Sequence, residues 1–176
     1  YLSLSQPEPE LLMSVGCVEM IDARSSGVIY TRDPVRPHDE VMVVNSIFGL
    51  GEYLVDGTLT PDSFRLSRQT RRVLKRELVK KPVRLILDRE GGTVREPIDE
   101  DDQQKASISD QELLTLLDYA LRIEKLYHCP QDIEWAIDRS GRIFILQSRG
   151  LRIIEPTPAR GPDLEPGGAR TLYRLR

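Results

Sequence analysis

The sequence predicts an α+β fold, with a mostly antiparallel sheet, one long packing helix and one short helix. Short runs rich in β-branched residues alternate with turn residues along most of the chain. Residues 130–149 have the pattern of two adjacent strands around the turn Ser140-Gly141. Ser109 and Glu112 have the spacing of a capping box, which predicts the start of the long helix.

The length and composition of the chain fit a single domain with a buried core. The chain has 176 residues, a formal net charge of −3 and two cysteines, Cys17 and Cys129. A chain of this length buries roughly 70% of its unfolded surface. The acidic balance argues against a general nucleic-acid or membrane-surface protein. The sequence contains no run of 18 apolar residues and does not open on a signal-like segment, so we expect a cytoplasmic protein with reduced thiols.

The first half of the chain is expected to hold three strands and the short helix. Residues 1–12 are expected to form an irregular lead-in because two prolines lie among polar residues. The strands are expected at residues 13–21, 27–31 and 40–47, with the first one buried and with a polar turn at 22–26. Gly49-Leu50-Gly51 then leads into a short helix from Glu52 to Val55. A lone Gly-x-Gly is a weak phosphate signal, so a flexible strand-to-helix turn is the better interpretation.

A basic segment overlaps the next predicted strand, which begins within residues 61–66. Between Arg65 and Arg84, nine Lys or Arg residues stand against one acid, Glu77. Nucleic-acid binding is one interpretation of such a run, but it lacks interleaved aromatic residues beyond Phe64. A solvated edge hairpin whose cations prevent strand pairing is the better interpretation. We therefore expect no nucleic-acid partner.

Residues 83–127 are expected to contain a small hairpin, an acidic loop and the long helix. Two short strands, 83–87 and 93–97, flank turn residues 90–92. The acidic run 99–102 lacks shaping glycines and is expected to be an exposed loop. The apolar face of the helix consists of Leu113, Leu116, Leu117, Ala120, Ile123 and Tyr127, and Glu124 lies beside it. Prolines and glycines accumulate in 155–176, which predicts a linker.

The predicted hairpin of residues 130–149 brings polar side chains together on one face. If Ser140 and Gly141 form its loop, Glu134 lies directly opposite Gln147. Opposed side chains have Cβ atoms about 4.5–5.5 Å apart, and two oxygen donors at that spacing suit Mg²⁺. In the same register Asp132 faces Arg149, whose guanidinium could bind a phosphate oxygen. From spacing alone, an ordinary polar sheet face explains these residues equally well.

Four stretches of the sequence resemble the nucleotide-binding domain of the phosphoenolpyruvate synthase and pyruvate phosphate dikinase family. The stretches are Ser26–Pro34, Gly49–Gly57 running on to Pro61-Asp62, Pro130–Ala136 and Ile145–Arg149. The resemblance covers about residues 13–150. It implies the C-terminal subdomain of an ATP-grasp fold at 13–154, with 155–176 leading to a phosphohistidine domain outside this chain. It also implies that the amino-terminal half of the grasp lies outside this chain.

The resemblance further implies a function and assigns residues to it. Glu19, Met20 and Ile21 would line the adenine pocket, Glu134 and Gln147 would bind Mg²⁺ and contact ATP, and Arg149 would bind ATP and act as the catalytic residue. Glu52 would orient neighbouring groups. The parent enzyme would transfer phosphoryl groups from ATP to a histidine and then to pyruvate, while this fragment alone would be inactive. Two alternatives stay open: a related phosphotransferase acting on an antibiotic or glucan, and a non-catalytic β-rich module that binds a partner.

Overall fold

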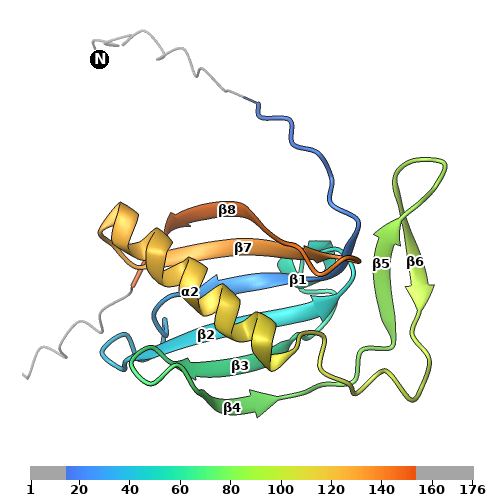
Figure 1. Ribbon diagram of the computed structural model, residues 1–176. Coiled ribbons are helices and arrows are strands. Elements are labelled where there is room, and N and C mark those ends of the chain that lie inside the picture. The colour runs from blue at the N-terminus through green and yellow to red at the C-terminus, as the bar shows by residue number, and fades with distance from the viewer. Residues whose placement is uncertain (1–14, 154–176) are drawn as a thin grey trace, which may run out of the picture.

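The chain forms one six-stranded antiparallel sheet and a separate two-stranded hairpin in residues 15–153, which the computed structural model describes (Figure 1). The strand order of the sheet is β4-β3-β2-β1-β7-β8, and the hairpin pairs β5 with β6. The strands are β1 (Ala23–Tyr30), β2 (Val41–Phe48), β3 (Asp62–Ser67), β4 (Val73–Glu77), β5 (Val83–Leu87), β6 (Thr93–Pro97), β7 (Gln131–Asp138) and β8 (Ile143–Gly150). Two helices, α1 (Glu52–Val55) and α2 (Asp110–Tyr127), complete the α+β fold that the sequence predicts.

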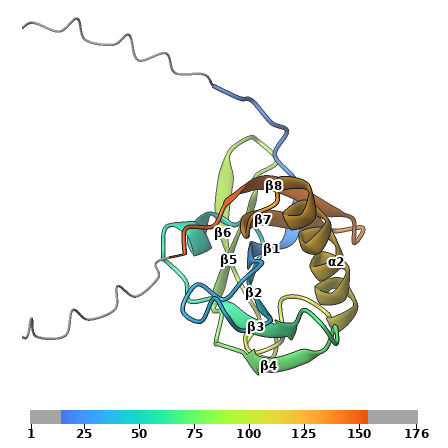
Figure 2. The ribbon, with the colours of Figure 1, turned by 90° about the vertical axis from the view of Figure 1, so that its left-hand side faces the viewer.

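The long helix α2 covers one face of the sheet, and α1 lies on the other side (Figure 2). The predicted capping box starts α2, because Ser109 Oγ accepts from the Glu112 amide at 3.3 Å while a Glu112 carboxylate oxygen accepts from the Ser109 amide at 3.0 Å. Leucines of α2 pack with Trp135 and other sheet residues in the core. Each such fully buried apolar side chain contributes about 1.5–3 kcal/mol. The predicted apolar face is wrong only at Tyr127, which is 58% exposed in the last turn of the helix.

The hairpin of β7 and β8 differs from the prediction in its loop but agrees with it at the proposed site. The Asp138 amide donates to the Arg142 carbonyl at 3.0 Å, so the loop has three residues and ends on Gly141 with φ +85°. A β-bulge follows, and Leu146 is the extra residue of β8. The bulge shifts the pairing back by one residue, which places Glu134 opposite Gln147 as predicted.

The prediction of a buried strand at 13–21 is wrong for residues 15–21. These residues have no regular secondary structure, and Val15 and Val18 are 81% and 86% exposed. The strand begins instead at Ala23, so most of the turn predicted at 22–26 is also wrong. The physical reason lies in the sheet, because β1 pairs with β2 on one edge and with β7 on the other. No free edge beside β1 is left for a preceding segment to join.

The basic segment from Arg65 to Arg84 is spread over three strands and the connections between them, and it is largely neutralised. Seven of its nine cations form ion pairs: six with acids outside the segment, such as Glu124 for Arg68, and Lys75 with Glu77 inside it. β4 is indeed an exposed edge strand, as the hairpin interpretation requires. Lys81, in contrast, is 1% exposed and pairs with the buried Asp62. The segment is therefore no continuous strip of free positive charge.

The predicted lead-in, 1–12, and the predicted linker, 155–176, both lie outside the described residues. The small hairpin β5–β6 agrees with the sequence prediction, and the predicted acidic loop 99–102 is exposed except at Asp102, which is half-buried. Among residues 15–153 no helix combines the length and apolar character needed to cross a bilayer.

Candidate functional site

The face of the sheet opposite α2 carries the candidate site on its three strands β1, β7 and β8. Side chains alternate along a strand, so Ile133 and Trp135 of β7 enter the core under α2 while Glu134 points to the open face. Pairing on both sides of β7 aligns Glu134 with Val28 of β1 and Gln147 of β8. The open face therefore brings together the two predicted metal ligands from different strands.

A second row of side chains lies next to the first on the same face. Asp132 of β7 pairs with Tyr30 of β1 and with Arg149 of β8. Residues two positions apart along a strand are separated by about 6.8 Å. Arg149 thus lies one step along the strand from Gln147. All three residues predicted for phosphate and metal binding share one small area.

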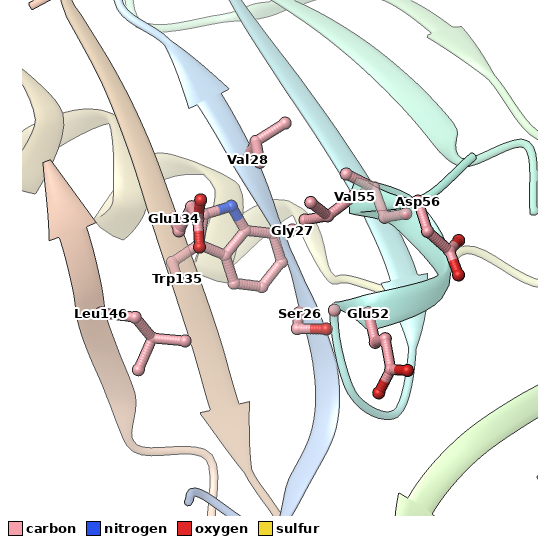
Figure 3. Close-up of a pocket in the computed structure, with 11 residues that line it drawn as sticks. Ser26, Gly27, Val28, Glu52, Val55, Asp56, Glu134, Trp135 and Leu146 are labelled. Carbon is pink, nitrogen blue, oxygen red and sulfur yellow. The ribbon is translucent and has the colours of Figure 1, made fainter. Parts of the chain in front are cut away.

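Two adjoining hollows extend from this area along the open face. The first, of about 390 Å³, lies between the sheet and α1 and is lined by Val28, Glu134, Leu146 and the helix residues Glu52 and Val55 (Figure 3). The second, of about 250 Å³, is lined by the predicted adenine-binding residues Glu19, Met20 and Ile21. Ser26, Gly51 and Leu146 line both hollows, so the two are neighbours.

The segment 15–22 thus reaches the predicted site without forming the predicted strand. Met20 is 58% exposed, and it shares the second hollow with Leu50, Ala136 and Leu146. An exposed apolar side chain beside a mostly apolar hollow can pack on a flat ring. The two adjoining hollows together form one trough, which Glu134 lines at one end and Glu19, Met20 and Ile21 line at the other.

The chemistry of Glu134 and Gln147 fits a hard cation. Glu134 is half-buried, Gln147 is exposed, and neither side chain has a hydrogen-bond or ion-pair partner within residues 15–153. Carboxylate and amide oxygens are suitable ligands for Mg²⁺, which keeps several waters and shares phosphate oxygens. The described part of the chain contains no group of three or more His, Cys, Asp or Glu residues able to enclose a metal. A cation here would need further ligands from water or from a bound phosphate.

Arg149 is the cation nearest to this pair in the strand pattern. Its Nε donates to Asp132 Oδ2 at 2.9 Å, its Nη2 lies 2.8 Å from the same oxygen, and this interaction raises the pKa of Arg149. Its side chain is 65% exposed. Arg149 is therefore permanently charged and accessible from the open face, as a phosphate-binding residue must be.

Sequence reasoning missed how α1 closes the first hollow. Ser26 Oγ donates to the Gly49 carbonyl at 2.7 Å, which holds the turn before α1 against β1. Glu52, at the start of α1, lines the same hollow as Glu134. The sequence signal available was the Gly-Leu-Gly turn between a strand and a short helix. That signal predicts the helix, but it does not say which face of the sheet the helix covers.

An open sheet face with an accessible arginine, two oxygen ligands without a partner in residues 15–153 and two adjoining hollows is an arrangement that suits an anionic ligand and a hard cation. The comparison with known families identifies the class of protein. The family described as "Pyruvate phosphate dikinase, AMP/ATP-binding domain" matches residues 4–161. The chain belongs to this family, which confirms the resemblance seen in the sequence.

The chain is similar in sequence to proteins of two different names, rifampicin phosphotransferase and phosphoenolpyruvate synthase. The chain is 32% identical over 149 residues to rifampicin phosphotransferase of Bacillus subtilis (strain 168), covering 85% of this chain and 17% of that protein. It is 36% identical over 149 residues to phosphoenolpyruvate synthase of Neisseria meningitidis serogroup B, covering 78% of this chain and 19% of that protein. It is also 36% identical over 152 residues to rifampicin phosphotransferase of a Streptomyces species, covering 86% of this chain and 17% of that protein. The chain thus spans less than one fifth of the length of each of these relatives.

Proposed function

We propose that this chain is the C-terminal subdomain of an ATP-grasp nucleotide-binding domain in an ATP-dependent dikinase. The observation that carries the proposal is the alignment of Glu134 and Gln147, both without protein partners in the described chain, beside the trough that Glu19, Met20 and Ile21 line. The family description names nucleotide binding. The proposed ligand is Mg–ATP, with its adenine at the second hollow and its phosphates toward β8.

Each predicted residue has a role that its position supports. Met20 and Ile21 pack on the adenine ring, and the backbone around Glu19 offers donors and acceptors to its edge. Glu134 and Gln147 hold Mg²⁺, which neutralises charge on the nucleotide phosphates when it is bound. Arg149 donates to a phosphate oxygen and stabilises the charge spread over the transferred phosphoryl group. These residues position and neutralise; none of them serves as nucleophile or general base.

The acceptor of the phosphoryl group is proposed to lie outside this chain. The family resemblance and the greater length of the relatives support a longer parent, in which another segment completes the grasp and a separate domain carries a phosphorylated histidine. Pyruvate is the proposed final acceptor, as in a phosphoenolpyruvate synthase, and the cytoplasm is the proposed location. This chain alone is expected to bind ATP weakly and to be inactive.

Rifampicin is the second candidate acceptor. Relatives named rifampicin phosphotransferase are 32% and 36% identical to this chain, as similar as the relative named phosphoenolpyruvate synthase. The proposed nucleotide site would be the same in both enzymes. Supplying the full-length protein with Mg–ATP and either pyruvate or rifampicin, and following the phosphorylated product by ³¹P NMR, separates the two. Product from rifampicin alone would overturn the pyruvate proposal.

The site assignment is tested by removing each metal ligand in the full-length protein. We expect Glu134→Ala and Gln147→Ala each to lower the affinity for Mg–ATP by about tenfold or more in calorimetric titrations. Gln111→Ala is the matched control, because Gln111 is an exposed amide on α2, on the far side of the sheet. Undiminished nucleotide-dependent histidine phosphorylation in both site variants would contradict the metal assignment.

A further inference from the structure

Asp132 and Arg149 form an ion pair with an uneven distribution of exposure. Asp132 is buried, at 8% exposure, whereas the side chain of Arg149 is 65% exposed. Arg149 Nε donates to Asp132 Oδ2 at 2.9 Å, and Nη2 lies 2.8 Å from the same oxygen in the ion pair. The buried Asp132 carboxylate therefore contacts one edge of the Arg149 guanidinium, the edge that carries Nε and Nη2.

The other edge of the Arg149 guanidinium stays free. A guanidinium has five N–H donors in a rigid plane, and Nη1 of Arg149 has no partner within the described chain. Arg68, in the turn after β3, shows the opposite arrangement, because its three nitrogens donate to Glu40, Glu124 and the Thr31 carbonyl. All three nitrogens of Arg68 are used in contacts within the protein, whereas Arg149 is held by one carboxylate and keeps N–H donors available for a ligand.

The surroundings of Asp132 keep this carboxylate in place. β7 is paired on both sides, so Asp132 is flanked by Tyr30 of β1 and by Arg149 of β8. Burial, and then the charge of Asp132, raise the pKa of Tyr30, so the phenol remains neutral beside the carboxylate. A carboxylate held in a central strand is a firm support, since its backbone cannot shift without breaking both ladders.

We propose that Asp132 is a positioning residue for the phosphate-binding arginine: it holds Arg149 by one edge so that the remaining N–H groups meet a nucleotide phosphate beside Glu134 and Gln147. This inference rests on the proposed function. The long arginine side chain would otherwise sample many rotamers, and small misplacements of a catalytic group cost much of its effect. The alternative is an ordinary surface ion pair, which contributes little.

The test compares steady-state kinetics of four forms of the full-length protein with Mg–ATP as substrate: wild type, Asp132→Asn, Arg149→Ala and the double variant. We expect Asp132→Asn to lower kcat by about 10- to 100-fold without lowering the melting temperature by more than a few degrees. The double variant should be no slower than Arg149→Ala alone, because Asp132 acts only through Arg149. Additive losses, or wild-type kcat in Asp132→Asn when Arg149→Ala is impaired, would overturn the proposal.

A matched control exists in the hairpin β5–β6. Arg84 and Glu96 are directly opposed there, and Arg84 Nε and Nη2 both contact one oxygen of Glu96 at 2.5 Å. Glu96→Gln weakens the same type of arginine–carboxylate contact at a position outside the proposed site, so kcat is expected to stay unchanged. A loss in this control as large as that in Asp132→Asn would count against a specific role for Asp132.

One further variant, Arg149→Lys, keeps the test decisive. If Asp132→Asn fails to fold, Arg149→Lys replaces the exposed partner instead; it keeps the charge but lacks the planar fork. Activity at the wild-type level in Arg149→Lys would overturn the proposal, and a loss similar to that of Arg149→Ala would support it. The proposed function fails separately, when both Arg149→Ala and Glu134→Ala keep wild-type turnover of ATP.

Discussion

Asp62 and Lys81 form a buried ion pair, and we predict that replacing Asp62 destabilises the fold much more than replacing Lys81 does. Both side chains are at most 1% exposed. Asp62 accepts four hydrogen bonds: from Lys81 Nζ at 2.5 Å, from the Val79 amide at 3.1 Å, and from the amide and hydroxyl of Ser107 at 2.9 and 2.8 Å. These donors precede β5 and follow β6. Asp62 therefore fastens both ends of the segment that carries the small hairpin.

Replacing Asp62 is expected to cost far more than replacing Lys81. Asp62→Asn leaves the Lys81 ammonium buried without its counter-ion and sets an amide donor against donors, for a loss of about 3–5 kcal/mol. Lys81→Met removes the charge but leaves Asp62 with its contacts to Val79 and Ser107, so the loss is expected to be about 1–3 kcal/mol. Since domains are stable by only about 5–15 kcal/mol, both losses are measurable.

Urea denaturation of the 176-residue chain checks this order. Trp135 is the only tryptophan and is 1% exposed, so its fluorescence reports the loss of the core. Lys105→Met serves as the control, because the Lys105–Asp102 pair is on the surface, and no resolvable change in midpoint is expected. A Lys81→Met variant that is less stable than Asp62→Asn would refute the reasoning that the hydrogen bonds to the carboxylate dominate.

Two further predictions concern the sheet and its link to α2. A Cβ added at Gly27 would lie 2.6 Å from a ring carbon of Trp135 and would also clash with a backbone carbonyl of β2. Gly27→Ala should therefore lower the free energy of unfolding by about 3 kcal/mol. Gly16→Ala is the control in the same urea assay: a Cβ at Gly16 would meet nothing within 4 Å, so the free energy of unfolding should not change. Burial would raise the pKa of Glu124, but hydrogen bonds from Arg68 outweigh burial and lower this pKa in the folded state. The Glu124 carboxylate therefore stabilises the fold at pH values above its unfolded-state pKa, and this stabilisation is lost as the pH falls through its folded-state pKa. Glu124→Gln should therefore lower stability by about 1–3 kcal/mol at pH 7, and the gap to wild type should close below about pH 4; a gap that does not depend on pH would contradict the assignment.

Local patterns predicted those parts of the fold that depend on near neighbours in the sequence. The capping box of Ser109 and Glu112 fixed the start of α2, and the β-branched run of β2 was visible without any tertiary information. The pairing of Glu134 with Gln147 was predicted as well, but from a two-residue loop; the actual loop has three residues, and the β-bulge at Leu146 restores the predicted pairing.

Features that depend on distant segments could not be predicted from local patterns. Residues 15–21 have an apolar composition typical of a buried strand, yet whether such a segment pairs depends on a free sheet edge, and β2 and β7 occupy both edges of β1. The burial of Lys81 had the same origin, since its partner Asp62 lies 19 positions earlier, at the start of β3. Charge counts along the sequence do not reveal which cations will find a buried carboxylate.

The β-bulge at Leu146 explains why the site residues of β8 lie on the open face at all. The three-residue loop alone would have aligned Glu134 with Leu146 and would have turned Gln147 and Arg149 toward the α2 side. The extra residue returns both side chains to the face that carries Glu134 and Asp132. Leu146 itself lines both hollows. One inserted residue thus places the proposed metal ligands Glu134 and Gln147 opposite each other and Arg149 opposite Asp132, and it also lines the two hollows.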